Sequence, residues 1–353
     1  MIFEPILDLF RGKAITIPPL DGPFRANNIL EEAALFAKLS SADNLAVLDN
    51  RVIANSGETL YALDEDGHAT KLQSYPAEIT AIAVSSKNEL VIGLENGDLL
   101  IAGQQVALPP SVKCITALSF APDGSLWIAN GSTHHPPSEW VVDLMEKNVT
   151  GSVWKCDPGV QSFRLIADKL AFPYGLLANN NGVVVSESWR HRLVRIDSET
   201  GVPKILVNHI PGYPSRLAPM PDGGAWLSIF APRNRLIELV LQETHYRFDM
   251  MASVPRDFWI APALSSGRSF LEPLQCGSIK LMGIHKPWAP SRSYGMVVCL
   301  DASMVPIYSL HSRANGTRHG TCSVIDNDNQ LFIAAKGGDC ILSINVSDAG
   351  GSQ

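Results

Sequence analysis

Short apolar segments alternate with polar turns along most of this chain, and one arrangement of them recurs. Residues 172–188 read FPYGLLANNNGVVVSES and residues 213–228 read YPSRLAPMPDGGAWLS. Both begin with an aromatic residue and proline, continue with an apolar run, and turn through Asn, Asp or Gly into a second apolar run. Runs of this length and composition predict antiparallel hairpins.

Six copies of this strand–turn–strand unit can be aligned on their turns. Five start at one equivalent position, and the sixth, shortened by two residues, starts at Asp43; the five are Thr80, Thr116, Tyr174, Ser215 and Thr321. A further strand-like segment follows each unit: TLYALD, DLLIAG, SVWKCD, RLVRID, RLIELV and CILSIN. Six such sheets pack best around an axis, which predicts an all-β, six-bladed β-propeller with four-stranded antiparallel blades. A β-sandwich or two separate domains is the alternative, but equal register in six units does not suit it.

Two regions depart from the repeat. The pattern NNILEEAALFAKL (27–39) predicts a short N-terminal helix, and AITIPPL (14–20) could supply the closing strand, so residues 1–42 form an N-terminal segment. Residues 242–292 form a long, lid-like insertion in the fifth blade, rich in Pro, Gly and aromatic residues. Long ordered loops tend to be functional, although a decorative loop is the alternative. We expect residues 1–353 to form a single propeller domain.

The composition of the chain restricts the classes of partner and the cellular compartment that we expect. The 353 residues are 46% hydrophobic and carry a net charge of −7 without a block of like charges, so nucleic acid is not an expected partner. The first 20 residues lack the basic region of a signal peptide, and no run approaches about 18 apolar residues, so we expect no membrane insertion. The six cysteines form no C-x-x-C motif, and we expect them reduced in a cytoplasmic protein.

Four blocks carry a family resemblance: LDGPFRANNILEEA, GSTHHPPSEWVVDLMEKNVTGSVWKCDP, LAFPYGLLANNNGVVVSESWRHRLVRID and IPGYPSRLAPMPDGGAWLSIF. In this order they resemble the strictosidine-synthase-like branch of six-bladed propellers, which is related to gluconolactonase, regucalcin (SMP-30) and paraoxonase. The resemblance implies the fold more strongly than the chemistry, since such propellers host lactonases, esterases and a condensing enzyme. Similar propellers joined to transporter permeases suggest a possible transport-linked context.

The six equivalent positions should meet at one mouth of the axial channel, because the innermost strand of each blade lines that channel. Four of them are expected to bind substrate: Thr80, Thr116, Ser215 and Thr321. The lactonase relatives hold calcium there, and their ligand positions carry over to Asp43, Thr116, Tyr174 and Ser215. Calcium prefers about 6–8 oxygen ligands, several of them anionic, and one carboxylate remains. We therefore expect no cofactor and no metal; Asp43 and Asn44 would be the ligands if calcium bound.

The synthase branch implies an acid–base residue in the loop that enters the last blade, where this chain has His319. A histidine there could act as general base or acid, or could be a loop residue bonded to backbone. Tyr174 could donate to an oxyanion or wall the pocket, and with Asp43 and His319 it completes the predicted catalytic set. Arg216 and Arg318 could bind a carboxylate or form surface ion pairs. Trp259, in the insertion, is a further candidate for substrate contact.

The main functional hypothesis is a metal-independent enzyme that acts on a small organic molecule in the axial pocket, with hydrolysis of a lactone or ester as the reaction. One alternative is a lyase, isomerase or condensing enzyme resembling strictosidine synthase. The other is a non-catalytic ligand-binding propeller linked to a transporter.

Overall fold

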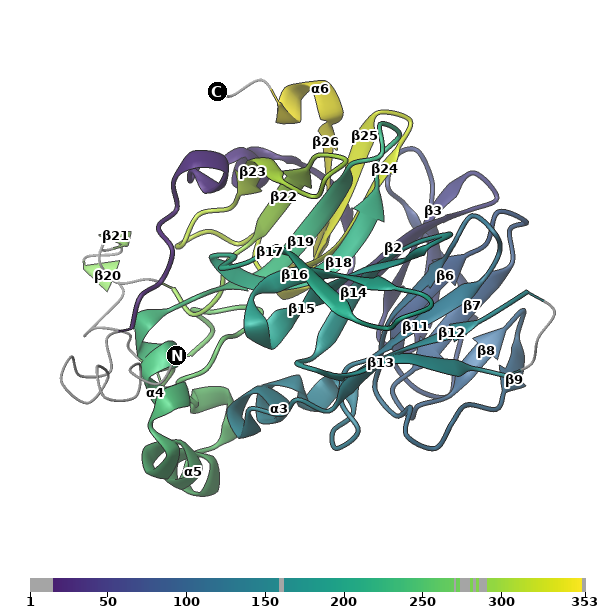
Figure 1. Ribbon diagram of the computed structural model, residues 1–353. Helices are drawn as coiled ribbons and strands as arrows, with labels where there is room; N and C mark the ends of the chain where they lie inside the picture. The colour runs from purple at the N-terminus through teal and green to yellow at the C-terminus, as the bar shows by residue number, and fades with distance from the viewer. Residues whose placement is uncertain are drawn as a thin grey trace.

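Six four-stranded antiparallel sheets surround a common axis (Figure 1). This computed structural model describes residues 15–158, 162–269, 271–273, 280–281, 284–285 and 291–350. The predicted six-bladed propeller with four-stranded blades is therefore confirmed.

The first four blades each use four consecutive strands. Blade 1 contains β2 (Ala42–Leu48), β3 (Arg51–Ser56), β4 (Thr59–Leu63) and β5 (Ala69–Ser74). Blade 2 contains β6 (Ile79–Val84), β7 (Leu90–Leu94), β8 (Leu99–Ile101) and β9 (Gln104–Val106). Blade 3 contains β10 (Ile115–Phe120), β11 (Leu126–Asn130), β12 (Gly151–Cys156) and β13 (Arg164–Leu170). Blade 4 contains β14 (Pro173–Asn179), β15 (Gly182–Glu187), β16 (Arg192–Asp197) and β17 (Pro203–Val207).

The last two blades are less regular. Blade 5 contains β18 (Gly212–Pro219), β19 (Ala225–Pro232), β22 (Met296–Leu300) and β23 (Pro306–His311). Blade 6 contains β24 (Thr321–Asn327), β25 (Gln330–Ala335), β26 (Cys340–Asn345) and, from the other end of the chain, β1 (Ala34–Lys38). Pairing of β1 with β26 closes the ring.

The closing strand differs from the sequence prediction. Residues 27–39 contain only the four-residue helix α2 (Ile29–Glu32), preceded by a 3-10 turn at Gly22–Phe24, and the rest of the predicted helix is β1. The described residues 15–20 of the AITIPPL segment form no strand. The open edge of β26 and the contact of Phe36 with Phe332, at 4.8 Å between ring centroids, outweigh the helical pattern.

The insertion in blade 5 also corrects one predicted strand. The segment RLIELV belongs to helix α4 (Arg235–Gln242), and the third strand of the blade is β22, after the insertion. Asn234 caps α4 by accepting from the Leu236 N–H at 2.9 Å, and Ile237, Val240 and Leu241 form one buried face, the spacing of an amphipathic helix.

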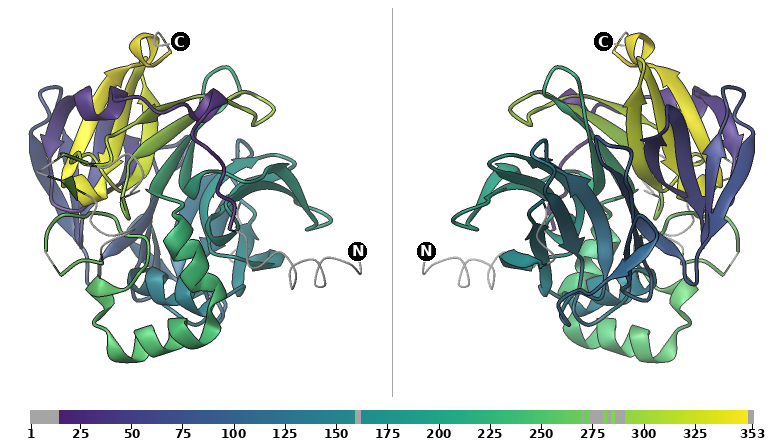
Figure 2. Two further views of the ribbon diagram at one scale, coloured as in Figure 1. Left: turned by 90° about the vertical axis from the view of Figure 1, so that its left-hand side faces the viewer. Right: turned by 90° about the vertical axis from the view of Figure 1, so that its right-hand side faces the viewer.

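The longer helices gather at one end of the propeller (Figure 2). Helix α3 (Trp140–Glu146) follows a 3-10 turn at Pro137–Glu139 in blade 3, while α5 (Thr244–Ser253) and a 3-10 turn at Arg256–Phe258 follow α4. Side chains of α3, α4 and α5 form one core cluster with Phe230 and Cys322 of the blades. The remaining short elements are 3-10 turns at Ser188–Arg190 and Lys336–Gly338, helix α6 (Val346–Ala349), and the pair β20 (Lys280–Leu281) and β21 (Ile284–His285).

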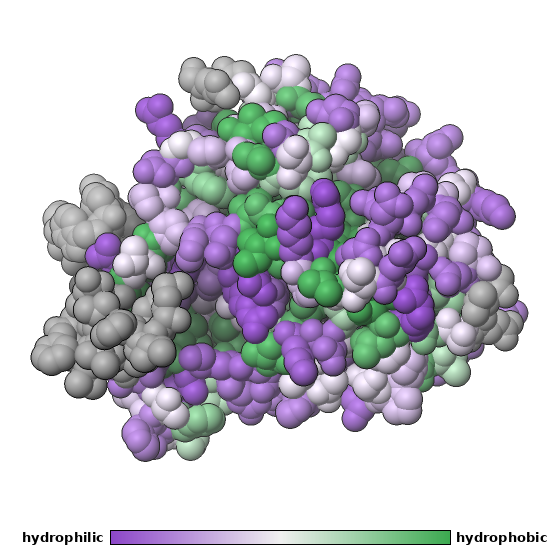
Figure 3. Space-filling view, in the orientation of Figure 1, coloured by the Kyte–Doolittle hydropathy of each residue, from purple (hydrophilic) through white to green (hydrophobic). Residues whose placement is uncertain are grey.

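Hydrophobic residues appear in small groups between hydrophilic ones on the face drawn in Figure 3. No helix in the described part of the chain has the length and apolar character needed to span a membrane.

Candidate active site

A cavity of about 300 Å³ opens at the helical end of the axis, and we call it the mouth cavity. Five of the predicted site residues line it: Asp43, Thr80, Thr116, Tyr174 and Arg216. The remainder of its wall comes from strand ends, from helix α3 and from the segments that connect the strands: Ser41, Glu78, Ile79, Glu95, Pro137, Ser138, Trp140, Phe172, Trp189, Phe230, Leu264 and Lys336.

A bulge in each innermost strand sets the direction of these side chains. All six inner strands shift register against their neighbour near the aligned position, for example between Ile79 and Ala81 around Thr80, and between Pro173 and Gly175 around Tyr174. A bulge leaves one residue unpaired and redirects its side chain. Repetition of the bulge in six blades therefore produces the ring at the mouth.

The centre of the ring is an ion cluster around Asp43. Its carboxylate oxygens lie 2.6 Å from Arg216 Nη1 and 3.1 Å from Lys336 Nζ, and Lys336 also lies 3.3 Å from Glu78. The side chain of Asp43 is 3% exposed. Burial alone would raise the pKa of Asp43, but Arg216 and Lys336 outweigh burial and hold it below its ordinary value.

Arg216 crosses the axis from blade 5. Its Nη2 donates to Thr80 O of blade 2 at 2.7 Å, and its Nη1 approaches Cys322 O of blade 6 at 3.4 Å. Its guanidinium carbon lies 5.0 Å from the Tyr174 ring centroid, within range of a cation–π contact. Burial raises the pKa of the Tyr174 hydroxyl, so this group stays protonated.

Lys336 presents a permanent positive charge to the mouth cavity. Its side chain is 22% exposed, and it enters from the turn that follows β25. Burial would lower the pKa of the ammonium, but Asp43 and further neighbours, Glu78 among them, outweigh it and raise the pKa. An ammonium has three N–H donors, and Asp43 and Glu78 account for two of them.

Glu95 is the carboxyl group of the cavity wall with an elevated pKa. Burial raises it, and Glu78 adds to the effect, whereas hydrogen bonding from Ser138 and the charge of Lys336 oppose it. Its Oε1 accepts from the Ser138 N–H at 3.0 Å. A carboxyl with a raised pKa and a charged ammonium in the wall of one cavity form a combination typical of acid–base sites.

Aromatic rings form the opposite wall. Phe172 stacks on Trp189 at 4.3 Å between centroids, and Trp140 meets Phe230 edge-on at 5.3 Å. Tyr174 contacts both Phe172 and Phe230. The cavity therefore has one charged side and one apolar side, a combination that suits a small molecule with an aromatic or aliphatic body and one polar reacting group.

Ser215 and Thr321 do not reach the mouth cavity and instead connect blades. Ser215 Oγ bonds to Ser228 O and Thr321 O, at 3.1 and 3.3 Å, and Thr321 Oγ1 bonds to Ile229 O at 2.8 Å and Met296 O at 2.9 Å. The bulge of β24 falls between Thr321 and Ser323, so Cys322 occupies the position equivalent to Tyr174.

Three more predicted residues lie outside the cavity lining. His319 is buried, with Nδ1 2.7 Å from Ser293 Oγ and Nε2 2.7 Å from Arg313 O, the geometry of a loop histidine bonded to backbone. Arg318 Nη1 approaches Cys340 Sγ at 3.3 Å. Trp259 is buried in the helical cluster and donates to Val254 O.

Sequence reasoning missed Glu95, Lys336 and Trp189, and a shared signal could have found them. Each follows the end of the second strand of its blade: β7 ends at Leu94, β25 at Ala335 and β15 at Glu187. In an antiparallel hairpin, the end of the second strand lies beside the start of the first. Positions just after the second strand therefore belong to the same mouth as the aligned ring.

The donor set does not suit the calcium ion of the lactonase relatives. Asp43 is the ring carboxylate, and two cations already contact it. Asn44 Oδ1 and Thr80 Oγ1 are buried without a hydrogen-bond partner in the described part of the chain, but both are neutral. Among the described residues, no group of three His, Cys, Asp or Glu side chains could hold a metal. Calcium requires more anionic oxygens than this arrangement supplies.

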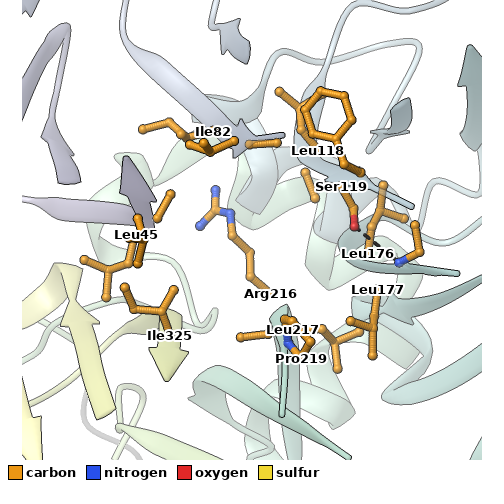
Figure 4. A pocket seen from close by; sticks show the side chains of 18 of the residues that line it. Leu45, Ile82, Leu118, Ser119, Leu176, Leu177, Arg216, Leu217, Pro219 and Ile325 are labelled. Carbon is orange, nitrogen blue, oxygen red and sulfur yellow. Dashed lines mark hydrogen bonds between the residues drawn. The ribbon is translucent and has the colours of Figure 1, made fainter. Parts of the chain in front are cut away.

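A second cavity of about 550 Å³, the opposite cavity, lies at the other end of the axis. Arg216 lines both cavities, and Figure 4 shows it surrounded by aliphatic side chains that include Leu45, Ile82 and Leu118. Two charged side chains, Arg216 and Asp326, line the opposite cavity, whereas the mouth cavity has five: Asp43, Glu78, Glu95, Arg216 and Lys336.

Comparisons with known proteins agree with the fold. A family model described as strictosidine synthase matches residues 116–209. A search of curated proteins gave no match. Among solved structures, a candidate gluconolactonase from a structural genomics series shares 14% identity and a TM-score of 0.55, over 89% of this chain and 91% of its own. A gluconolactonase from Xanthomonas campestris shares 14% identity and a TM-score of 0.53, over 88% of this chain and 87% of its own.

The fold and the mouth cavity define a six-bladed propeller with a cavity at one end of its axis. The matched family model, with the fold, confirms the resemblance to the superfamily of strictosidine synthase and gluconolactonase that the sequence motifs predict. At 14% identity, the likeness to the gluconolactonases shows the fold.

Proposed function

We propose that this protein is a hydrolase that cleaves a lactone or ester of a small, largely apolar molecule in the mouth cavity, without a metal ion. The observation that carries the proposal is that Glu95 and Lys336 both line a cavity with aromatic residues in its wall. The gluconolactonase neighbours, which share the fold, favour lactone hydrolysis over other reactions.

Glu95 is the proposed general base. Its carboxylate removes a proton from water while the water oxygen attacks the carbonyl carbon of the substrate. The protonated carboxyl then returns the proton to the leaving alkoxide as the carbon–oxygen bond breaks. Burial favours this role because it brings the pKa of Glu95 closer to neutrality and makes the carboxylate a stronger base.

Lys336 is the proposed electrophile. Its ammonium would bind the carbonyl oxygen and stabilise the oxyanion of the tetrahedral intermediate. Asp43 and Glu78 hold it in place and keep it protonated through the reaction. The neutral Tyr174 hydroxyl and the rings of Trp140, Phe172 and Phe230 would enclose the apolar part of the substrate.

A panel of lactones and aryl esters tests the proposal with the wild-type protein and three purified variants. We expect Glu95→Gln to lower kcat/KM by about 10²–10⁴-fold, since it removes a general base. We expect Lys336→Met to lower it by about 10²–10³-fold, since it removes an oxyanion donor. Glu89→Gln, an exposed glutamate in the turn before β7, is the matched control and should retain wild-type activity. Wild-type turnover that persists in Glu95→Gln would exclude this mechanism, and saturable binding without turnover would favour a ligand-binding propeller.

His319→Ala separates this mechanism from the histidine hypothesis. Because His319 lies outside the cavity lining, its loss should leave kcat/KM within a few-fold of wild type once correct folding is verified. A loss as large as that of Glu95→Gln would restore His319 as the base.

Metal independence has its own test. Incubation with EDTA, followed by desalting, should change neither the activity nor the melting temperature, because a metal bound to the folded state would raise that temperature. A lower melting temperature that calcium restores would contradict the proposal.

A further inference from the structure

A third cavity of about 450 Å³, the side cavity, adjoins the mouth cavity at the helical end. The two share three wall residues, Ser138, Trp140 and Leu264. The insertion of blade 5 supplies most of the remaining lining, including Arg256, Arg268 and Arg292.

The three arginines differ in their surroundings. Arg256 reaches Glu139 at 3.1 Å and Arg268 reaches Asp339 at 3.4 Å, and both side chains are largely solvent-exposed. Arg292 is only 5% exposed, and no carboxylate lies within ion-pair distance of it in the described part of the chain. Its one hydrogen bond to these residues runs from Nη1 to the backbone oxygen of Asp257 at 3.0 Å, and its Nε has no partner among them.

The nearby carboxyl groups do not neutralise Arg292 by contact. Glu272 accepts from the backbone N–H groups of Gly267, Arg268 and Ser269, at 2.9 to 3.2 Å. Asp257 contacts Arg292 through its main chain. Burial lowers the pKa of Arg292, and the charges of Glu272 and Asp257 only partly oppose it.

A buried guanidinium without an ion-pair partner costs folding free energy, and such groups are typical of sites that bind an anion. The backbone around Arg292 is fixed, since its carbonyl accepts from the Ala263 N–H at 3.0 Å and Ser291 bonds to Ser266. The side chain is therefore held in the cavity wall before a ligand arrives, which reduces the entropy lost on binding.

We propose that the side cavity is a carboxylate-binding subsite in which Arg292 binds a monocarboxylate with an apolar body. One guanidinium matches one negative charge, while the carboxyl groups of Asp257 and Glu272 would repel a dianion such as phosphate. The shared wall of Trp140 and Leu264 suits the apolar body of the ligand. The substrate class that we infer rests on the proposed function: the subsite would select lactones or esters that also carry a free carboxylate.

Binding is tested first, without any assumption about activity. Calorimetric titration with benzoate should show saturable binding to the wild-type protein, at least ten-fold weaker binding to Arg292→Gln, and no change beyond two-fold in Arg268→Gln, the exposed arginine of the same wall. Benzamide, the neutral analogue, and inorganic phosphate should bind more weakly than benzoate. Equal benzoate affinity in wild type and Arg292→Gln, or tighter binding of phosphate, overturns the proposal.

Thermal melting distinguishes a binding role of Arg292 from a purely structural one. Removing an unpaired buried charge should leave the melting temperature of Arg292→Gln equal to or above that of wild type. A marked fall would mean that Arg292 supports the fold and would overturn the proposal. Arg292→Lys keeps the charge but loses the planar fork, and should bind benzoate at an intermediate level.

Measurements of kcat/KM then test the proposed subsite and the proposed catalytic mechanism independently of each other. Wild type should hydrolyse an aryl ester that carries a carboxylate with a kcat/KM at least ten-fold above that of its carboxamide analogue. Arg292→Gln should lose this preference and keep the hydrolysis of the carboxamide, whereas Glu95→Gln should lose both activities and retain benzoate binding. Benzoate binding through Arg292 in a protein without esterase activity would refute the hydrolase and leave the subsite.

Discussion

At the scale of single residues, the mouth cavity depends on a balance of charge around Asp43. Two cations share one buried carboxylate, and Lys336 has a second partner in Glu78. The same contacts that hold Lys336 in the wall of the mouth cavity also stabilise the fold. Substitutions here should therefore affect stability and activity together.

Asp43→Asn should lower the free energy of unfolding by about 3–5 kcal/mol, because it leaves Arg216 and Lys336 without their buried counter-charge. The pKa of Asp43 is lowered in the folded state, so its contribution is present above the unfolded pKa and is lost as the pH falls through the folded pKa. Urea unfolding between pH 3 and 7 should show a smaller acid-dependent loss in Asp43→Asn than in wild type. Asp64→Asn, at an exposed pair with His68, is the control and should change little.

The pKa shift of Glu95 has the opposite direction to that of Asp43. Its pKa is raised in the folded state, so the folded protein binds more protons than the unfolded chain, and stability falls as the pH rises through the folded pKa. Glu95→Gln should therefore melt at a higher temperature than wild type at pH 8, with a smaller difference at pH 4. In parallel, kcat/KM of wild type should rise with pH to a plateau as Glu95 ionises. Lower stability of Glu95→Gln at pH 8 would contradict the raised pKa.

The sequence predicted some of the residues that line the mouth cavity, and there is a physical reason why it did not predict the others. Asp43, Thr80, Thr116 and Tyr174 follow from the repeat, because a shared position in six inner strands must converge on the axis. Glu95 and Lys336 lie after strand ends, where spacing alone does not tell a turn residue from a site residue. Arg216, one of two arginine candidates, becomes central only through its hydrogen bonds to three other blades.

At the scale of elements, side-chain hydroxyls join the inner strands to their neighbours. Thr116 Oγ1 donates to Pro173 O at 2.6 Å across blades 3 and 4, and Ser119 Oγ accepts from the Ala178 N–H at 3.2 Å across the same boundary. Thr321 performs this role between blades 6 and 5. Polar residues in the aligned ring therefore serve assembly at some positions and the cavity at others.

Thr321→Val should cost about 1–3 kcal/mol in the free energy of unfolding, because buried backbone groups of Ile229 and Met296 lose their partner while the shape is kept. Activity of the folded variant should stay at the wild-type level, since Thr321 does not line the mouth cavity. Thr70→Val, on the exposed strand β5, is the matched control for chemical denaturation. No difference in stability between the two variants would exclude a role for the interblade bonds.

Strand prediction succeeded where period-two patterns recur and failed where tertiary pairing decides. RLIELV has the apolar content of a strand, but a capping Asn234 and a 3.6-residue spacing make it helical. ALFAK reads as the end of a helix, yet the unpaired edge of β26 draws it into the sheet. The strand at ALFAK cannot be read from a short local window, because its partner β26 is distant in sequence. The helix at RLIELV could have been, because Asn234 and the residue spacing are local.

At the scale of the whole molecule, closure of the ring depends on the N-terminal segment. Leu30 is fully buried in the core of blade 6, Glu31 accepts from the Thr317 N–H at 2.9 Å, and Ala34 pairs with Ser343. These contacts join the first and last described parts of the chain and complete the sixth sheet.

Deletion of residues 1–39 should abolish cooperative thermal unfolding and cause self-association, because it exposes the edge of β26 and part of the blade 6 core. Calorimetry and size-exclusion chromatography would detect both effects. A synthetic peptide of residues 15–40 should restore a cooperative transition when added in excess. A truncated monomer that melts like wild type would contradict this account of closure.

The pairing of β1 with β26 also has a consequence for biosynthesis. On the ribosome, β1 is translated before the other strands of all six blades, and its partner β26 follows only after the other blade strands. Until then the nascent chain carries an unpaired strand at one end and an unfinished ring at the other, a condition that favours chaperone engagement. The mouth cavity includes side chains of blade 1 and of blade 6, so it can take shape only after Lys336 has been translated.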